Sequence, residues 1–597
     1  MIRRSIFLLV LIIIGLVLFF NPDFKTIAAG VAILLFGMVT LEEGFKVFTR
    51  GPLKRILKKA TGKLYKSIGV GAIVTAVIQS SSLVSVVTIS FISAGLISLS
   101  GGIGLIYGAN IGTTFTAWLV AIFGLKVNIS VLAMPMLIFG ILFSFQKSKS
   151  LKGLGNVLTG LGFFFLGIHY MKEGFDVFGQ YIDLTQYSIE GRLGILVYTG
   201  IGIAMTTILQ SSSASLALIL TALAAGQISY ENALALAIGT NIGTTITAII
   251  GSIGSNIAGK RLALAHLIFN LITGVLALLF IVPLGNLVNL LSKNIGIASD
   301  DYTLKLALFH TLFNVFGVLI MIPFITVLEK FLMKYVKDKH EKDIDEPKYL
   351  NKAVLEFPGT IGTSLEKETK YLFENAIFEI VAHALNMHRS DIRSDQKIRA
   401  VVKKSKKEMD VNVRDLYIKK VKTIYGKIIE YATKAQMELN LEKAQSKRIT
   451  EIKIANRKMV EIIRDVKELR INVLHYTQSE NVYMKREYQG FRRMVAKVLR
   501  ASYLFQDIEN QDLNKQTIID LKKYFKQKLK RTNKRINKHI RKNLIDVNMA
   551  SSLVNDHDNV NDMIDKFLQV CELLYVEHDT LLEPIEPEID RAHHNTD

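Results

Sequence analysis

The chain has almost no cysteine and contains long stretches without charge. Its 597 residues include one cysteine, Cys571, which excludes an intramolecular disulfide and fits a reducing compartment for the C-terminal half. No lysine or arginine occurs in residues 67–125 or 193–259, and no aspartate or glutamate occurs in residues 44–172. The chain is nevertheless 50% hydrophobic and carries a formal charge of +21. It is too long for one domain and too apolar for an ordinary soluble protein.

Apolar segments dominate the sequence from Ile6 to about Leu332. They are roughly 16 to 24 residues long and alternate with short polar loops, so each can approach or cross a hydrocarbon core of about 30 Å. The start, MIRRSIFLLVLIIIGLVLFF, has the composition of a signal peptide, but no small-residue cleavage site follows, and we interpret it as a retained first span. After Lys334 the pattern changes to dense charge with helical periodicity. We predict a transmembrane domain at residues 1–335, a linker at 336–355, a soluble helical bundle at 356–580 and a tail at 581–597.

The positions of lysine and arginine indicate how the apolar segments cross the membrane, because basic residues favour cytoplasmic loops. Residues 67–97 form either one span or a re-entrant hairpin that is broken at the serines. We prefer the hairpin because it keeps the basic loop at residues 147–152 in the cytoplasm, and a second hairpin follows around Gln210. The result is an all-α polytopic membrane protein with about eight spans, two re-entrant hairpins and both termini in the cytoplasm. The loops predicted to be cytoplasmic are 50–66, 147–152, 259–261 and the tail from Lys334, whereas 179–191 is predicted to lie outside.

Three short motifs occur twice, in the same order and at nearly the same spacing. LEEGFKVF at Leu41 matches MKEGFDVF 130 residues later, and QSSS at Gln79 and GANIGTT at Gly108 match QSSS and GTNIGTT 131 residues later. This pattern indicates an internal duplication with halves at about 26–150 and 156–285. The loop before the first QSSS is strongly basic and the loop before the second is not, so we expect the halves to be inverted relative to each other. Inverted repeats with interrupted helices are typical of secondary transporters.

The QSSS segments lie at a depth where lipid-exposed irregular backbone is not tolerated, so each break must line an enclosed or watery cavity. We expect Ser82 and Ser213 to cap the half-helices that follow. The free N–H groups and positive dipole ends of these half-helices favour an anion, and serine hydroxyls can donate to an oxyanion or coordinate a small hard cation. The alternative is that the hydroxyls only hydrogen-bond neighbouring helices. Four motifs in two registered copies favour a binding site.

Apart from Glu231 near a loop, no charged side chain accompanies these motifs, so we expect no carboxylate in the site. Burying an unpaired anion costs far more than helix dipoles alone offset, and a cation that binds together with the anion is the natural solution. Sodium fits this role better than a proton, because we expect no buried carboxylate or histidine beside the motifs. We predict no enzymatic activity, no cofactor other than sodium as coupling ion, and no transition-metal site.

Paired QSSS hairpins, each followed by a G-x-N-I-G-T-T segment, resemble the type II sodium/phosphate cotransporter family over roughly residues 26–332. The resemblance implies that both QSSS segments bind sodium and phosphate, with the Asn and Thr side chains of the following segment beside them. Thr75 and Thr206, each four residues before a QSSS glutamine, are additional candidates. The implied site residues are Gln79, Ser80, Ser81, Ser82, Asn110, Thr113, Thr114, Gln210, Ser211, Ser212, Ser213, Asn241, Thr244 and Thr245.

Two histidine-asparagine pairs lie near the end of the apolar region. HLIFN places His266 and Asn270 on one helix face, and HTLFN does the same for His310 and Asn314. They could tune a pH dependence, since histidine titrates near neutrality, but we prefer hydrogen bonding between helices. The glutamates at matching span ends, Glu43 and Glu173, are interpreted as interface anchors and not as ligands.

The charged tail has the pattern of a helical bundle. It contains almost no glycine or proline and predicts about six helices, one of which carries an apolar stripe. Bacterial members of the family often carry a PhoU-like domain here, and the tail resembles one in length and pattern. We interpret the basic run at residues 522–543 as a solvated helix face, with contact to anionic lipid as the alternative; its few aromatics argue against nucleic acid. The stripe comprises Met459, Ile462, Ile463, Val466, Leu469 and Val473.

The sequence thus predicts a sodium-coupled transporter of inorganic phosphate in the cytoplasmic membrane, with a cytoplasmic helical domain that regulates it. The expected partners are inorganic phosphate, sodium and the lipid bilayer; a homo-oligomer is left open, and no nucleic acid is expected. Two alternatives also stay open. One is a membrane-tethered phosphate sensor, and the other is a transporter of a different small anion or an exporter of phosphate.

Overall fold

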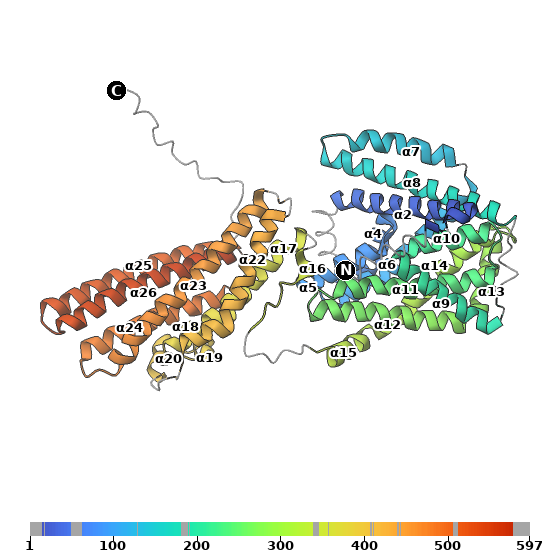
Figure 1. The fold of residues 1–597 in the computed structure, drawn as a ribbon. Coiled ribbons are helices and arrows are strands. Elements are labelled where there is room, and N and C mark those ends of the chain that lie inside the picture. Colours follow the sequence, from blue (N-terminus) through green and yellow to red (C-terminus); the bar gives the residue numbers. More distant parts are fainter. Residues whose placement is uncertain are drawn as a thin grey trace, which may run out of the picture. The chain divides into compact units, whose positions relative to one another are not determined.

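The computed structural model of the chain is built from helices, and the residues that it describes contain no strand (Figure 1). It describes residues 15–16, 18–48, 63–127, 129–180, 189, 191–337, 345–355, 358–405, 409, 411–438, 441, 443–505 and 511–576. Most of the predicted first span, of the basic loop at 50–66 and of the loop at 179–191 lies outside these residues. The chain divides into a membrane unit, Met1–Lys339 with Asn351–Thr360, and a bundle unit, His340–Leu350 with Ile361–Asp597.

Seven helices in the described part of the membrane unit are long and apolar enough to cross a bilayer, which confirms the predicted all-α, multi-pass class. The helix α9 is one of them by length, although the sequence assigned it to the second hairpin. The elements are α2 (Pro22–Phe48), α4 (Leu64–Ile78), α5 (Ser81–Ser93), α6 (Leu99–Leu119), η2 (Val120–Gly124), α7 (Ile129–Ser144), α8 (Lys149–Phe178), α9 (Gly191–Leu209), α10 (Ser212–Ala224), α11 (Tyr230–Ser252), α12 (Ile257–Leu279), α13 (Ile281–Asn294), α14 (Tyr302–Met321), η4 (Ile322–Phe324), α15 (Ile325–Tyr335) and α16 (Lys352–Leu355).

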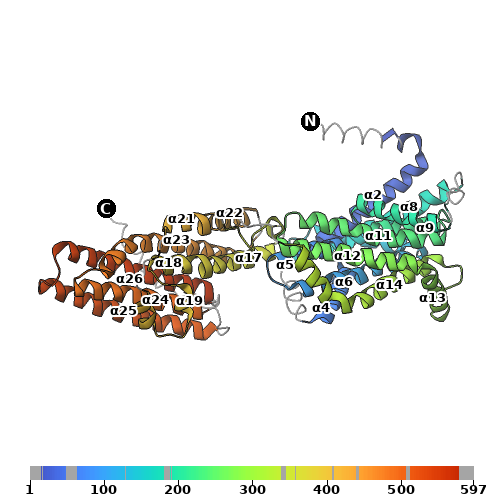
Figure 2. The ribbon, with the colours of Figure 1, turned by 90° about the horizontal axis from the view of Figure 1, so that it is seen from below.

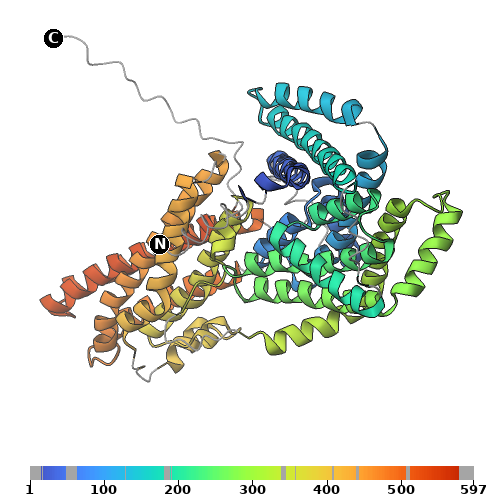
Figure 3. The same cartoon turned by 45° about the vertical axis from the view of Figure 1, so that its right-hand side comes forward.

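The helices that begin the two copies of the repeat, α2 and α8, pack closely against each other (Figure 3, dark blue and cyan). Glycines spaced seven residues apart form the contact. A Cβ atom added at Gly37 would lie 2.5 Å from the backbone nitrogen of Phe164, so a larger residue cannot fit without moving the helices apart. Because residue numbers rise along one helix and fall along the other, the two helices are antiparallel. The facing glycines are Gly30 and Gly167, Gly37 and Gly160, and Gly44 and Gly153.

The glycines of GANIGTT and GTNIGTT also allow close helix packing. A Cβ atom at Gly108 in α6 would lie 2.0 Å from the carbonyl oxygen of Ile68 in α4. In the second copy, a Cβ atom at Gly239 in α11 would lie 2.2 Å from the carbonyl oxygen of Thr199 in α9. The glycines of each repeated motif therefore allow its helix to pack closely against the half-helix that leads into a QSSS segment.

A short segment after the last long membrane helix packs back onto the first hairpin. Ala353 and Val354 in α16 are buried, and the Ser90 hydroxyl in α5 donates to the carbonyl oxygen of Ala353 at 3.0 Å. The Thr360 hydroxyl donates to the carbonyl oxygen of Val354 at 2.9 Å and closes this segment on itself. Part of the predicted linker at 336–355 is therefore a packed segment of the membrane unit.

The bundle unit consists of helices that pack lengthwise, as α23, α24 and α26 show in Figure 2. All six residues of the predicted apolar stripe on α23 are buried, which confirms that this face points into the core. Cys571 is also buried and unpaired, and residues 577–597, with the predicted tail, lie outside the described residues. The elements are α17 (Pro358–Tyr371), η5 (Leu372–Ile377), α18 (Phe378–Ala384), α19 (Arg389–Arg393), α20 (Ile398–Lys404), α21 (Val413–Tyr417), η6 (Ile418–Lys422), α22 (Thr423–Glu438), α23 (Lys443–Thr477), α24 (Val482–Leu504), α25 (Gln511–Arg541) and α26 (Val547–Tyr575).

Candidate functional site

Both QSSS segments interrupt a helix through one glutamine in the left-handed backbone conformation. Gln79 has a φ of 60° and Gln210 a φ of 52°, and the serine after each glutamine is extended. A left-handed residue other than glycine is uncommon and costs about 1–3 kcal/mol. The same costly conformation at both repeat positions shows that the breaks are a built feature of the fold. The next half-helix begins directly afterwards, at Ser81 in α5 and at Ser212 in α10.

The first serine of each motif caps the half-helix. The Ser80 hydroxyl accepts from the N–H of Leu83 at 3.2 Å, and the Ser211 hydroxyl accepts from the N–H of Ala214 at 3.1 Å. The prediction that Ser82 and Ser213 are the caps is wrong. A single left-handed residue reverses the chain, so the helix restarts two residues earlier than expected. The second and third serines of each motif consequently lie in the first helical turn, where backbone N–H groups lack partners within the helix.

The two motifs line one cavity of about 220 Å³. All eight residues of the two QSSS segments contribute to its wall, although they are far apart in the sequence. The rest of the wall comes from α2 and the end of α9. The structure therefore brings the predicted QSSS residues of both copies together. Their additional lining neighbours are Leu35, Met38, Val39, Glu42 and Leu209.

Two threonines that the sequence analysis missed connect each copy of the repeat to the hairpin of the other. The Thr116 hydroxyl in α6 donates to Gln79 Oε1 at 2.8 Å and lies 3.1 Å from the hydroxyl of Ser213. The Thr247 hydroxyl in α11 donates to Ser82 Oγ at 3.3 Å. Thr247 follows Thr116 by 131 residues, the spacing of the repeat. Extending the repeated motif by two residues would have identified both.

A carboxylate lies in the cavity, contrary to the expectation from the sequence. Glu42 in α2 lines the wall, and the Ser80 hydroxyl donates to its Oε2 at 3.4 Å. The sequence did not reveal this because Glu42 precedes the charge-free stretch and reaches the break only through helix packing. In the second copy of the repeat Lys172 occupies the corresponding position, so the carboxylate belongs to one copy only. Glu43 and Glu173 are exposed and outside the lining residues, and their role as interface anchors stays a prediction.

The Asn and Thr side chains predicted beside the QSSS segments are buried, but none belongs to the lining residues of the cavity. Most bond to carbonyl oxygens of their own helix, as Thr113 does to Ala109 at 2.9 Å and Thr244 to Thr240 at 2.8 Å. Their role in binding stays a prediction. The side chains of this kind that bond within their own helix are Asn110, Thr113, Thr114, Thr244 and Thr245.

Asn241 differs, because it connects helices. Its Nδ2 donates to Asn314 Oδ1 at 2.7 Å, and its Oδ1 lies 3.0 Å from Nε2 of His310. Hydrogen bonding between helices, preferred from the sequence, is thus confirmed for the pair His310 and Asn314. In the other pair, Asn270 Nδ2 donates to the carbonyl oxygen of His266 in the same helix at 3.1 Å.

The two additional candidates, Thr75 and Thr206, are both buried. The Thr206 hydroxyl donates to Ser215 Oγ in α10 at 3.0 Å, which ties the two half-helices of the second hairpin together. The Thr75 hydroxyl has no hydrogen-bond partner among the described residues. Neither threonine lines the cavity, and their contribution to binding also stays a prediction.

An all-α membrane protein in which two interrupted helices meet at a polar cavity has the architecture of a secondary transporter. Residues 33–173 and 195–298 match the sequence model of the Na+/Pi-cotransporter family. These residues contain both QSSS segments and both G-x-N-I-G-T-T segments. The resemblance predicted from the motifs is therefore confirmed, because this part of the chain matches the Na+/Pi-cotransporter family. The family is one of transporters and not of enzymes.

Several curated proteins are similar to about half of the chain. The "Putative inorganic phosphate export protein YjbB" of Salmonella typhimurium is 29% identical over 335 residues, which cover 55% of this chain and 59% of that protein. Its counterpart in Escherichia coli K12 is 28% identical over 346 residues, which cover 57% of this chain and 61% of that protein. The "Uncharacterized protein YqeW" of Bacillus subtilis is 28% identical over 52% of this chain and 92% of its own length. The match thus spans less than two thirds of the YjbB proteins but nearly all of YqeW. No solved structure matches the chain.

Proposed function

We propose that the membrane unit is a sodium-coupled secondary transporter of inorganic phosphate in the cytoplasmic membrane. The observation that carries this proposal is the shared cavity of about 220 Å³ at which two half-helices begin. It combines serine hydroxyls from both copies of the repeat with one carboxylate. Sodium acts as the coupling ion, and no other cofactor takes part.

The cavity suits an anion that must bind and also leave. The N-terminal turns of α5 and α10 provide N–H groups without partners within the helix and the positive ends of two helix dipoles. Amides and hydroxyls can therefore hold phosphate by hydrogen bonds. The lining residues contain no lysine, arginine or histidine, so no fixed ion pair holds the anion. Binding of moderate strength is what a translocation site requires.

The cavity also suits a cation. Glu42 would repel phosphate unless a positive charge lies between them, so the carboxylate favours binding of the two ions together. Hydroxyl, amide and carboxylate oxygens are the ligands that hard cations prefer. The sequence predicted no carboxylate in the site, so Glu42 adds a cation ligand that the motifs did not reveal. Each net charge moved inward gains about 2.3 kcal/mol per 100 mV of membrane potential.

We propose an inverted repeat for the membrane unit, with both termini in the cytoplasm. The antiparallel packing of α2 and α8, which begin the two copies, supports opposite orientations of the copies. The reciprocal contacts of Thr116 and Thr247 with the hairpin of the other copy support the same symmetry. The orientation relative to the cytoplasm rests on the basic loops of the sequence.

Export is the second candidate for the direction of transport, because two of the relatives carry the description "Putative inorganic phosphate export protein". The cavity residues do not favour either direction, since the gradients of sodium and phosphate determine the net flux. The bundle unit lies beyond the residues that match the family, and we propose it as a cytoplasmic regulatory domain. Its resemblance to PhoU rests on length and helical pattern alone.

Flux through the reconstituted full chain tests the function. Proteoliposomes with radiolabelled phosphate outside should accumulate it when sodium is outside, and much less with lithium or potassium. Binding of phosphate without accumulation would indicate a membrane-tethered sensor instead. Undiminished phosphate uptake in potassium would remove the sodium coupling, and accumulation of sulfate but not phosphate would change the anion.

A further inference from the structure

A second polar pocket lies in the bundle unit, between α24 and α25 and next to the start of α20. Its volume is about 650 Å³, within the range of about 300–1,000 Å³ typical of small-molecule sites. The α24 and α25 residues recur every three or four positions, so each helix turns one face toward the pocket. The lining residues are Ile398, Arg399, Arg486, Gly490, Arg493, Met494, Lys497, Tyr524, Lys528, Thr532 and Arg535.

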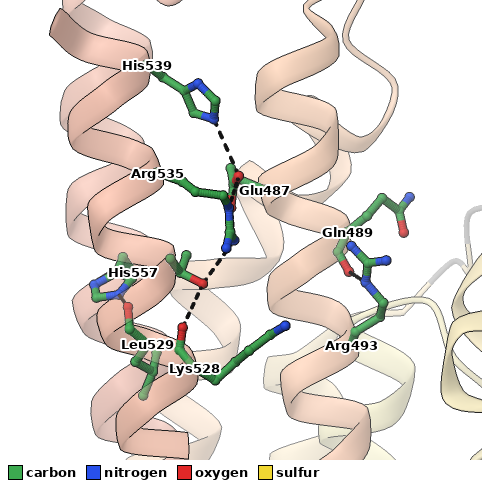
Figure 4. Close-up of polar contacts among 9 residues, drawn as sticks. Glu487, Gln489, Arg493, Lys528, Leu529, Arg535, His539 and His557 are labelled. Atoms are coloured by element: carbon green, nitrogen blue, oxygen red, sulfur yellow. Dashed lines mark hydrogen bonds and ion pairs between the residues drawn. The ribbon is translucent and has the colours of Figure 1, made fainter.

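The basic run on α25 is divided between two faces of that helix. Lys528 and Arg535 line the pocket, and Figure 4 shows Lys528 extending from α25 toward the helix that carries Arg493. Lys526 and Lys530 are exposed and do not line it. From the sequence, we interpreted the whole run at residues 522–543 as a solvated helix face. The structure shows that part of it forms one wall of a concave site.

The charges in the pocket are unbalanced. The lining residues include six basic side chains and no acidic one. Arg535 is the lining residue that binds a carboxylate: its Nε lies 3.0 Å from Oε1 of the buried Glu487 and its Nη2 lies 2.8 Å from Oε2, and Glu487 itself does not line the pocket. Among the described residues, no ion pair joins Arg399, Arg486 or Lys528 to an acidic side chain.

The remaining contacts position the cations without neutralising them. Arg493 uses its Nε to donate to the carbonyl oxygen of Gln489 at 3.0 Å, and the Lys497 ammonium lies 3.5 Å from the centre of the Tyr524 ring. Burial lowers the pKa of Arg493, and the positive charge of Arg399 and of other arginines nearby lowers it further, against an opposing effect of Glu487. Like charges held together in a pocket repel one another, and an anion would remove that cost.

We propose that this pocket binds a small molecule that carries two or more phosphoryl groups in a row. Arginine forks and lysine ammonium groups are the usual partners of phosphate oxygens. One orthophosphate could touch only some of the six cations, which come from three helices, and would leave the others unpaired. A chain of phosphoryl groups can contact both walls. The membrane surface fits less well, because the cations line a concave pocket and not one outer face.

Inorganic tripolyphosphate and ATP are the two probes that show whether the ligand is a bare chain of phosphoryl groups or a nucleotide. The full chain in uncharged detergent and sodium-free buffer would be titrated with each by calorimetry, and with orthophosphate as a third ligand. Both triphosphates should bind saturably if the phosphoryl chain is recognised, and binding of ATP alone would identify the ligand as a nucleotide. Equal affinity for orthophosphate would overturn the proposal.

The matched variants are Lys528→Gln inside the pocket and Lys530→Gln outside it, with the same change of charge on the same helix. Loss of a charged hydrogen bond is worth about 1.5–3 kcal/mol, so Lys528→Gln should weaken triphosphate binding about tenfold or more. Lys530→Gln should change it by less than about twofold. Both side chains are exposed, so both variants should retain the thermal stability of the parent.

Equal effects of the two variants would show that binding follows overall charge, and the proposal would fail. No saturable binding of either triphosphate would also overturn it and return the basic run at residues 522–543 to its interpretation as a solvated helix face. Because Lys528 belongs to the bundle unit, its substitution should leave sodium-dependent phosphate flux by the membrane unit intact. The pocket and the transport function can therefore fail independently.

Discussion

Single hydroxyl groups should decide the affinity of the membrane cavity, because its lining residues offer no lysine, arginine or histidine as a substitute. Ser81→Ala or Ser212→Ala removes one hydroxyl from the first turn of a half-helix. A hydrogen bond to a charged partner is worth about 1.5–3 kcal/mol, so each change should raise the phosphate KM about tenfold or more. Initial rates of sodium-dependent uptake at equal protein level measure this.

The control for these variants is Ser85→Ala. Ser85 lies on the same half-helix as Ser81 and is buried, but its hydroxyl has no partner among the described residues. The second copy of the repeat has Leu216 at the corresponding position, so the fold does not require a hydroxyl there. Ser90 would be a poor control because it bonds to Ala353. Similar losses at all three serines would show that the motif hydroxyls serve packing.

Glu42 allows the cation site to be tested separately from the anion site. Glu42→Gln keeps the shape of the side chain and removes its charge, so the sodium concentration for half-maximal uptake should rise by about tenfold. The phosphate KM at saturating sodium should change much less. Glu43→Gln, at the exposed neighbour, is the control and should change neither. A larger effect on the phosphate KM than on sodium activation would contradict a cation site at Glu42.

Glu487 should make the stability of the bundle unit depend on pH. Burial raises its pKa, but the hydrogen bonds and charges of Arg535 and His539 outweigh burial, and the pKa lies below its ordinary value. The charged form therefore stabilises the folded state above the ordinary glutamate pKa of about 4.3, and this contribution is lost as the pH falls through the folded-state pKa.

Glu487→Gln should therefore be less stable than the parent at pH 7, by about 1–3 kcal/mol. The difference should shrink as the pH falls below about 4.3. Urea unfolding of the full chain followed by circular dichroism measures it, with the exposed Glu480→Gln as control. A difference that stays constant over this range would mean that the charge of Glu487 contributes nothing.

At the level of residues, local chemistry was predictable from the sequence and contacts across the fold were not. Hydroxyls beside a helix break are a local signal, and they identified both QSSS segments. The caps were misplaced because the end of the first half-helix depends on the backbone conformation of Gln79. Glu42 was missed because its place in the cavity depends on the packing of α2 against α8 and the hairpins.

Among the elements, the contact of α2 with α8 sets the framework in which the hairpins meet. Gly37→Ala should destabilise the membrane unit, because the added methyl group would lie 2.5 Å from a backbone atom of α8. Overpacking costs about 1–3 kcal/mol. Gly200→Ala in α9 is the control, since nothing lies within 4 Å of its added atom.

The two alanine variants should affect the thermal stability differently. Alanine favours a helix over glycine by about 1 kcal/mol, so Gly200→Ala should be neutral or stabilising. Thermal stability of the purified protein in detergent measures both effects. Equal stability of the two variants would show that α2 and α8 can move apart to accept the methyl group without loss of stability. The sequence predicted both helices from their apolar length, but the glycine spacing becomes meaningful only when the two helices are known to face each other.

At the scale of the whole molecule, the boundary between the two units does not coincide with the end of the last long membrane helix. The segment Asn351–Thr360 returns to the membrane unit and covers part of α5, whose N-terminus reaches the cavity. The change to dense charge after Lys334 predicted that this segment belongs partly to a linker at residues 336–355 and partly to the soluble bundle from residue 356. Its burial depends on contacts with α5 that no local pattern encodes. A conformational change in this segment would act directly on a half-helix of the site.

The position at which the chain is shortened should therefore decide whether transport survives. A chain that ends after Thr360 keeps the packed segment, and we expect sodium-dependent phosphate uptake close to that of the full chain. A chain that ends after Lys337 loses Ala353 and Val354 and exposes their apolar contacts on α5, so uptake should fall several-fold. Complete loss of uptake by a properly inserted chain ending after Thr360 would instead make the bundle unit part of the transport machinery.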